Sequence, residues 1–194
     1  MKLTKKPFIF LRHGETPMNQ LRLIAGSTDT PLSDTGREEA RRAAELLADI
    51  HWSVIGVSPL QRAHETAQLA TSGQQLTLLE GLRERDWGDL EGAPWETLIP
   101  YTETPAGGEN WDHFTQRVLL ALNQLLEHEM PLVVAHSGIF RVIRALATGT
   151  PEGDRVGNAQ PVLVLPPDGN QSTWTFINLT SDNMTPSFKE QYFG

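Results

Sequence analysis

The 194-residue sequence contains no cysteine. It can therefore form no disulfide bond, no zinc–thiolate site and no catalytic thiol, and this composition fits a reducing, cytoplasmic setting. Long apolar runs are missing as well. The polar stretch 1–6 leads into only four apolar residues, whereas a signal peptide needs a longer apolar segment and a membrane span needs about 20 residues. We therefore expect a cytoplasmic protein with no membrane partner.

Positive charge is also scarce. The chain has 16 lysines and arginines against 24 acidic residues, so its formal net charge is −8. A nucleic-acid-binding protein needs a basic face that neutralises phosphates, and the sequence offers none. The excess of negative charge would also repel a small anionic substrate at long range. A site for such a substrate must therefore concentrate arginine locally.

The length and the hydrophobic content of 39% suit one α/β domain with a full core. No internal repeat, low-complexity tract or linker divides the chain. We therefore predict a single domain over residues 1–194, in which the polar, patternless tail after about residue 180 is loosely held.

Three short apolar runs, at 8–11, 54–57 and 132–135, read as buried strands. The first ends at Arg12-His13-Gly14, the second leads through Ser58-Pro59 to Arg62, and the third ends at His136. In a parallel sheet the carboxyl ends of the strands meet at one edge, where ligands bind. Forked arginine contacts suit phosphoryl oxygens. The sequence therefore predicts a phosphate site that contains two histidines and two arginines.

The rest of the chain supplies the other elements of such a fold. Apolar spacing predicts four helices. The first starts near 33–35, where Thr35 and Glu38 are spaced as a capping box. The second starts at Arg62, the third spans 112–129, and the fourth follows His136. A short strand is expected at 76–79, and 161–165 is expected to pair with 173–178 as a hairpin through a turn at 167–170. A long loop is expected at 17–33, and a short helix with a loop over the site is expected at 93–108.

Several motifs occur in an order that resembles the histidine phosphatase superfamily, the phosphoglycerate mutase-like proteins. They are R-H-G-E-T at 12–16, Asn19, L-S-D-T-G-R-E-E-A at 32–40, S-P-L-Q-R-A-H-E-T-A at 58–67, L-R-E-R-D-W-G-D-L-E-G at 82–92, G-G-E-N at 107–110 and A-H-S-G at 135–138. The resemblance covers roughly residues 8–180. It implies a three-layer α/β/α fold with a mostly parallel central sheet, and an enzyme that needs no metal ion and no cofactor.

The resemblance also implies roles for individual residues. His13 matches the nucleophile, which attacks phosphorus to give a phosphohistidine. Its other ring nitrogen must be held as a hydrogen-bond donor, most simply by a backbone carbonyl such as that of Gly14. Arg12, Arg62 and His136 match the groups that bind the phosphoryl oxygens and stabilise the charge of the transition state.

Glu84 matches the proton donor to the leaving alkoxide, which later deprotonates the attacking water. Desolvation would raise the pKa of this carboxyl and the arginines would lower it, so the sequence leaves the balance open. Asn19 matches a residue that helps to hold the phosphate. Ser137 could bind phosphate through its backbone N–H or cap its helix, and Glu109 could lie at the rim of the site or in the first turn of a helix.

We therefore predict a metal-independent phosphatase that acts on a small phosphorylated metabolite. A phosphoglycerate mutase is the nearest alternative, and a non-catalytic phospholigand-binding module is a second. A metal site built from His13, His136 and Glu84 is disfavoured because Arg12 and Arg62 would lie beside the ion. The sequence leaves open the leaving group, the choice between monomer and homodimer, and whether Trp87 and Trp95 line the pocket.

Overall fold

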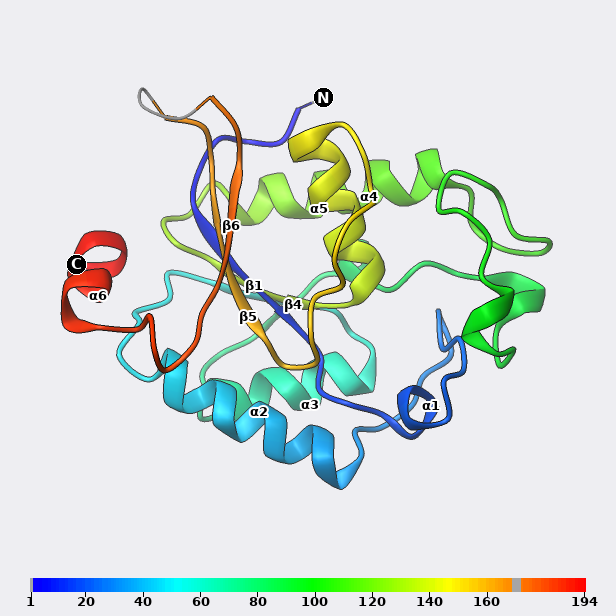
Figure 1. Ribbon diagram of the computed structural model, residues 1–194, viewed down its shortest axis with the longest axis horizontal. Helices are drawn as coiled ribbons and strands as arrows, with labels where there is room; N and C mark the ends of the chain where they lie inside the picture. Colours follow the sequence, from blue (N-terminus) through cyan, green and yellow to red (C-terminus); the bar gives the residue numbers. More distant parts are fainter. Residues whose placement is uncertain (1, 169–171) are drawn as a thin grey trace.

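The computed structural model describes residues 2–168 and 172–194, and within these ranges a single mixed sheet of six strands forms the centre of the molecule (Figure 1). The strands are, in chain order, β1 (Phe8–Arg12), β2 (Ile55–Val57), β3 (Thr77–Leu78), β4 (Leu132–Ala135), β5 (Pro161–Leu165) and β6 (Thr175–Asn178). Across the sheet the order is β3-β2-β4-β1-β5-β6. The first four strands run parallel, and β5 and β6 add an antiparallel edge.

Helices cover both faces of the sheet, which confirms the predicted α/β architecture. Helices α2 (Asp34–Leu47) and α3 (Gln61–Ala70) lie on one face, and α4 (Trp111–Leu125) and α5 (Ser137–Thr148) lie on the other (Figure 1). Side chains of β1 alternate between the two resulting cores, because successive residues of a strand point to opposite faces. Phe8 and Phe10 pack toward α4 and α5, whereas Ile9 and Leu11 pack toward α2 and α3.

The register of the central strands brings the ends of β1, β2 and β4 together. Arg12 is aligned with Ala135, and Val57 with Val134. The backbone N–H of His13 then donates to the Ala135 carbonyl over 2.9 Å, and that of Ser58 to the Val134 carbonyl over 3.0 Å. The segments that follow the three strands therefore leave the sheet side by side.

The N-terminal region departs from the prediction in its helix caps. Residues 17–33 are not wholly a loop, because α1 (Pro17–Gln20) begins directly after Thr16, whose side chain forms a capping box with Asn19. The predicted capping box at Thr35 and Glu38 is wrong. The cap of α2 is Ser33, whose hydroxyl accepts the Gly36 N–H over 3.1 Å. Several serines and threonines here could serve as caps, and the path of the chain selects among them.

The C-terminal half differs from the prediction in two places. Helix α4 ends at Leu125 rather than at residue 129, and a turn leads on to β4. The tail after residue 180 is not loosely held, because α6 (Pro186–Phe193) packs Phe188, Tyr192 and Phe193 against the α2/α3 core. The predicted pairing of the hairpin strands is confirmed, but residues 169–171 of its turn lie outside the described residues.

Short 3-10 helices occupy the segment between β3 and α4. They are η1 (Glu80–Leu82), η2 (Gly88–Leu90) and η3 (Trp95–Thr97). This segment lies beyond the carboxyl ends of the parallel strands and carries the predicted acid, Glu84. Among the helices of the described ranges, none combines the length and the apolar character needed to cross a membrane.

Candidate active site

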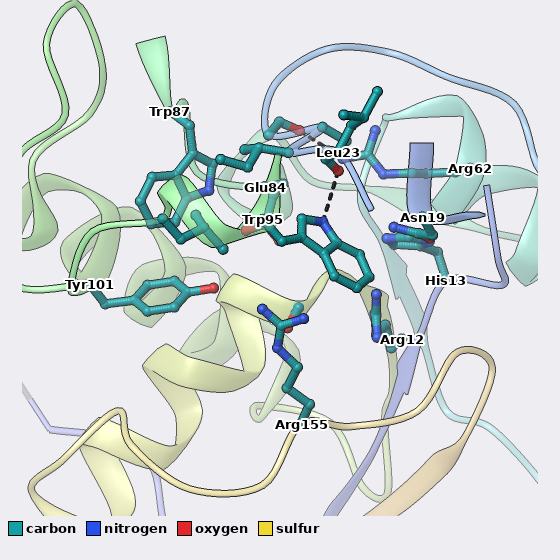
Figure 2. A pocket seen from close by; sticks show the side chains of 15 residues that line it. Arg12, His13, Asn19, Leu23, Arg62, Glu84, Trp87, Trp95, Tyr101 and Arg155 are labelled. Atoms are coloured by element: carbon teal, nitrogen blue, oxygen red, sulfur yellow. Dashed lines mark hydrogen bonds between the residues drawn. The ribbon is translucent and has the colours of Figure 1, made fainter. Parts of the chain in front are cut away.

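A cleft opens at the carboxyl ends of the parallel strands and gathers most of the predicted site residues (Figure 2). Its lining includes six of them: Arg12, His13, Asn19, Arg62, Glu84 and Ser137. His136 lies directly behind His13, with 5.2 Å between the centroids of the two rings, and is fully buried. The structure therefore brings together residues that are as many as 125 positions apart in the sequence.

His13 is held in one orientation by its own turn. Its Nδ1 lies 2.7 Å from the Gly14 carbonyl oxygen, and the Gly14 N–H donates to the Thr66 hydroxyl over 3.0 Å. A Cβ at Gly14 would lie 2.4 Å from the Gly36 carbonyl oxygen, so only glycine allows this close approach. A carbonyl can only accept a hydrogen bond, so Nδ1 carries a proton.

The electrostatic surroundings keep the His13 ring neutral. Burial lowers its pKa well below the usual 6.5, and the positive charges of Arg62 and Arg12 lower it further. A neutral ring with its proton on Nδ1 has a free lone pair on Nε2. His13 is therefore prepared to act as a nucleophile at neutral pH.

Arg12 and Arg62 are buried cations fixed by backbone carbonyls. Arg12 donates to the Val156 carbonyl over 2.9 Å, and Arg62 donates to those of Thr28 and Gly26 over 2.8 and 2.7 Å. Burial lowers the pKa of Arg62 to about 10, which leaves it protonated at neutral pH. Neither guanidinium forms an ion pair within the described residues. Both charges therefore remain available to an anion in the cleft.

His136 presents a second neutral imidazole. Its Nε2 lies 2.7 Å from the Ser58 hydroxyl, and burial, followed by the charge of Arg62, lowers its pKa well below the usual value. Its Nδ1 is buried without a hydrogen-bond partner in the described structure, as are Nε of Arg12 and Nε of Arg62. Unpaired buried polar groups are costly, and phosphoryl oxygens would supply acceptors to those that carry a proton.

Glu84 is held by two backbone donors. Its Oε1 accepts the Arg85 N–H and its Oε2 accepts the Gly138 N–H, each over 2.9 Å. These bonds and the nearby Arg62 and Arg117 favour the carboxylate, but desolvation outweighs them and raises the pKa of Glu84. The balance that the sequence left open is therefore decided by burial, in the direction that a general acid requires.

Asn19 and Ser137 both lie at helix starts beside the cleft. The side-chain oxygen Oδ1 of Asn19 accepts the Thr16 N–H and a bond from the side-chain amide of Asn158, each over 3.2 Å. These two bonds orient the Asn19 side chain, whose amide nitrogen is left for a ligand. Ser137 is the first residue of α5 and follows His136, the cap residue, which makes no capping bond with its side chain. The start of a helix favours an anion, although the Gly138 N–H of this turn already donates to the Glu84 carboxylate.

The sequence leaves Glu109 either at the rim of the site or in the first turn of a helix, and the structure places it one residue before Asn110, the cap of α4. It is not among the residues that line the cleft; both of its carboxylate oxygens pair with Arg117, over 2.7 and 2.8 Å. Arg117 also donates to the backbone carbonyls of Gly81, Arg83 and Glu84. The pair thus braces the segment that carries the acid, and Glu109 acts behind the cleft.

Among the polar residues of the cleft, sequence reasoning did not single out Tyr101 and Arg155, and it left Trp87 and Trp95 undecided. All four line the cleft (Figure 2). The indole N–H of Trp95 donates to the Leu23 carbonyl over 2.9 Å, and Trp87 and Tyr101 meet edge to face. Burial and the charge of Glu84 raise the pKa of Tyr101 to about 12. No motif marks Tyr101 or Arg155, because both lie in irregular loops.

Fold and site together define the class: a phosphoglycerate mutase-like α/β protein with two arginines and two histidines at one sheet edge. The sequence matches the histidine phosphatase superfamily (branch 1) over residues 8–173. The chain belongs to this family, and its relatives include proteins named as phosphatases and as mutases.

Individual relatives cover most of the chain. It is 34% identical over 156 residues to "Uncharacterized phosphatase PhoE" of Bacillus subtilis, and this alignment covers 73% of this chain and 78% of that protein. It is 31% identical over 157 residues to a 2,3-bisphosphoglycerate-dependent phosphoglycerate mutase of Cytophaga hutchinsonii, spanning 70% of this chain and 74% of the mutase. The crystal structure of TTHB049 from Thermus thermophilus superimposes with a TM-score of 0.71 at 31% identity, covering 90% of this chain and 99% of that one.

Proposed function

We propose that this protein hydrolyses phosphomonoesters of small metabolites through a phosphohistidine on His13, without a metal ion. The observation that carries the proposal is the bond between His13 Nδ1 and the Gly14 carbonyl, together with the lowered pKa of the ring. The two features supply a neutral imidazole with a lone pair on Nε2, beside two arginines that have no carboxylate partner in the described part of the chain.

In the first step Nε2 of His13 attacks phosphorus, and the bond from phosphorus to the leaving oxygen breaks. Arg12, Arg62 and His136 surround His13 and stabilise the charge on the phosphoryl oxygens. If the Ser58 hydroxyl donates to Nε2 of His136, the neutral ring carries its proton on Nδ1 and can donate it to a phosphoryl oxygen.

Glu84 completes both steps as acid and then as base. Its raised pKa keeps a larger share of protonated carboxyl near neutral pH, and this proton passes to the leaving alkoxide. The resulting carboxylate removes a proton from water, whose oxygen attacks phosphorus. The phosphorus–nitrogen bond breaks, inorganic phosphate leaves, and His13 regains its lone pair.

A phosphoglycerate mutase is the alternative, because a mutase is among the relatives. A mutase must shield its phosphohistidine from water, which requires a substantial lid. Here Glu109 follows Glu84 after only 25 positions, and within this interval the loop 93–108 forms one 3-10 turn, Trp95–Thr97. The short segment favours transfer to water.

The experiment incubates the enzyme with 3-phosphoglycerate, with and without 2,3-bisphosphoglycerate, and follows 2-phosphoglycerate and free phosphate together. A panel of other phosphorylated metabolites, read by released phosphate, identifies the preferred leaving group. We expect phosphate release from at least one substrate to exceed isomerisation. Isomerisation much faster than phosphate release from every substrate would establish the mutase instead.

A further inference from the structure

Arg155 places an exposed positive charge on the side of the cleft where the leaving group would lie (Figure 2). Its guanidinium carbon lies 4.9 Å from the centre of the Trp95 ring. It forms no ion pair with any carboxylate of residues 2–168 and 172–194. Arg22 provides a contrast: its guanidinium lies 5.9 Å from the same ring but is paired with Glu96 over 2.8 Å.

The backbone on both sides of Arg155 is held in place. On its N-terminal side, Arg144 donates to the Asp154 carbonyl over 2.8 Å, and Arg141 donates to the carbonyl of Gly153 over 2.7 Å. On its C-terminal side, the Val156 carbonyl accepts the bond from Arg12. The loop that carries Arg155 is therefore tied directly to Arg12, an arginine of the phosphate site.

The charge of Arg155 reaches the groups at the centre of the cleft. Burial is the main cause of the lowered pKa of Arg12, and the positive charge of Arg155 adds to it. Arg155 also opposes the rise in the pKa of Tyr101 that burial causes. The cation is thus close enough to act on a ligand that spans the space between the phosphate site and the Trp95 and Tyr101 side chains.

We propose that Arg155 binds a second anionic group, a carboxylate or a second phosphate, carried by the leaving group of the substrate. This inference rests on the proposed function, because it takes Arg12, Arg62 and His13 as the site of the reacting phosphoryl group. A cation that has no carboxylate partner among the described residues, that is carried by a backbone held on both sides and that lines the cleft, matches an acceptor supplied by the ligand. The substrate is accordingly a phosphomonoester with at least two separate anionic groups.

The first test compares matched substrates in the wild type and Arg155→Gln. Phosphate release is measured from 3-phosphoglycerate and glycerol 3-phosphate, which differ by a carboxylate, and from fructose 1,6-bisphosphate and fructose 1-phosphate, which differ by a phosphate. For at least one pair, we expect Arg155→Gln to lower kcat/KM about tenfold more for the member that carries a second anionic group. Most of this loss should be a rise in KM, because the variant removes a charge-assisted contact to that group. The pair that responds identifies the anion.

Arg22→Gln is the matched control, since it removes the same charge beside the same tryptophan, and we expect it to change these ratios less than twofold. Equal losses on both members of both pairs in Arg155→Gln, or equal effects of the two variants, would show that Arg155 only packs against Trp95.

A second measurement separates this inference from the proposed reaction. The same four compounds are titrated into His13→Ala and into the double variant His13→Ala/Arg155→Gln, and their binding is measured by calorimetry. This measurement does not require turnover. A preference of about tenfold for a doubly anionic compound that disappears in the double variant would support the subsite, even if no compound is hydrolysed by the wild type. Identical affinities in the two proteins would overturn it, even if the wild type is an active phosphatase.

Discussion

The carboxylate of Glu84 is tied to the backbone N–H of Gly138 over 2.9 Å, two residues after His136. This bond joins the segment that carries the acid to the first turn of α5, which also presents Ser137 to the cleft. The proposed acid and the proposed phosphate site at the edge of the sheet are therefore joined by this hydrogen bond. The contact lies inside the protein, where burial raises the pKa of the carboxyl.

Removing the acid should affect substrates according to their leaving groups. Glu84→Gln keeps the size of the side chain but cannot donate the proton that an alkoxide needs. General acid catalysis is worth about 10²–10⁴-fold, so we expect a loss of that order on alkyl phosphates and a much smaller one on p-nitrophenyl phosphate. Steady-state kinetics on both substrates measure the difference. Equal losses would place the acid elsewhere.

Displacing the acid without removing it should have a related effect. A Cβ added at Gly138 would lie 2.1 Å from Oε1 of Glu84, so Gly138→Ala should move the carboxylate away from its backbone donors. Alanine favours a helix over glycine by about 1 kcal/mol, which limits any loss of stability. We expect the alkyl phosphate activity to fall at least tenfold while the urea unfolding midpoint stays near that of the wild type. Full activity in this variant would mean that the position of Glu84 tolerates the shift.

The covalent intermediate can be trapped directly. Wild-type protein mixed with a labelled substrate and denatured should carry phosphate that is labile in acid and stable in alkali, as expected for a phosphohistidine. His13→Ala should carry none and should not turn over, although its circular dichroism spectrum should match that of the wild type. Normal turnover by the variant would remove His13 from the mechanism.

Positive charge in the cleft comes from arginine, so activity should survive prolonged treatment with EDTA. Vanadate should inhibit competitively, since it can occupy a phosphoryl site as a five-coordinate mimic of the transition state. Within the described residues, no group of three or more His, Asp or Glu side chains could hold a metal ion. Loss of activity on chelation, with recovery on adding zinc or manganese, would contradict the proposed mechanism.

The two buried histidines should make the protein sensitive to acid. Their pKa values are lowered in the folded state. Below pH 6.5 the unfolded chain therefore binds more protons than the folded protein, and the free energy of unfolding decreases as the pH is lowered. Each can contribute up to about 1.4 kcal/mol between pH 7.5 and 5.5. Urea unfolding in phosphate-free buffer should show that His136→Gln loses less stability than the wild type over this range. Equal losses would mean that His136 is protonated in the folded protein.

The sequence alone determined the strands, the segments that follow them and the identity of the family. The apolar runs before Arg12, Ser58 and His136 are local signals, and parallel pairing brings their ends to one edge whatever the details of packing. The ends of these strands supplied the arginine and histidine candidates for the cleft, and the family resemblance supplied Glu84 and Asn19. The orienting bond from His13 to the Gly14 carbonyl was also predicted, because it lies within a single turn.

The tertiary structure decided what depends on contacts between distant segments. The sequence left Glu109 either at the rim of the site or in the first turn of a helix, and in the structure Arg117 of α4 holds its carboxylate behind the cleft. The tail after residue 180, which looked patternless in the sequence, forms helix α6, and three of its aromatic side chains pack against the α2/α3 core. The pKa of Glu84 follows from burial against opposing charges, and Arg155 and Tyr101 join the site from loops without a motif. Desolvation and long-range packing are properties of the folded chain, so only the structure could reveal them.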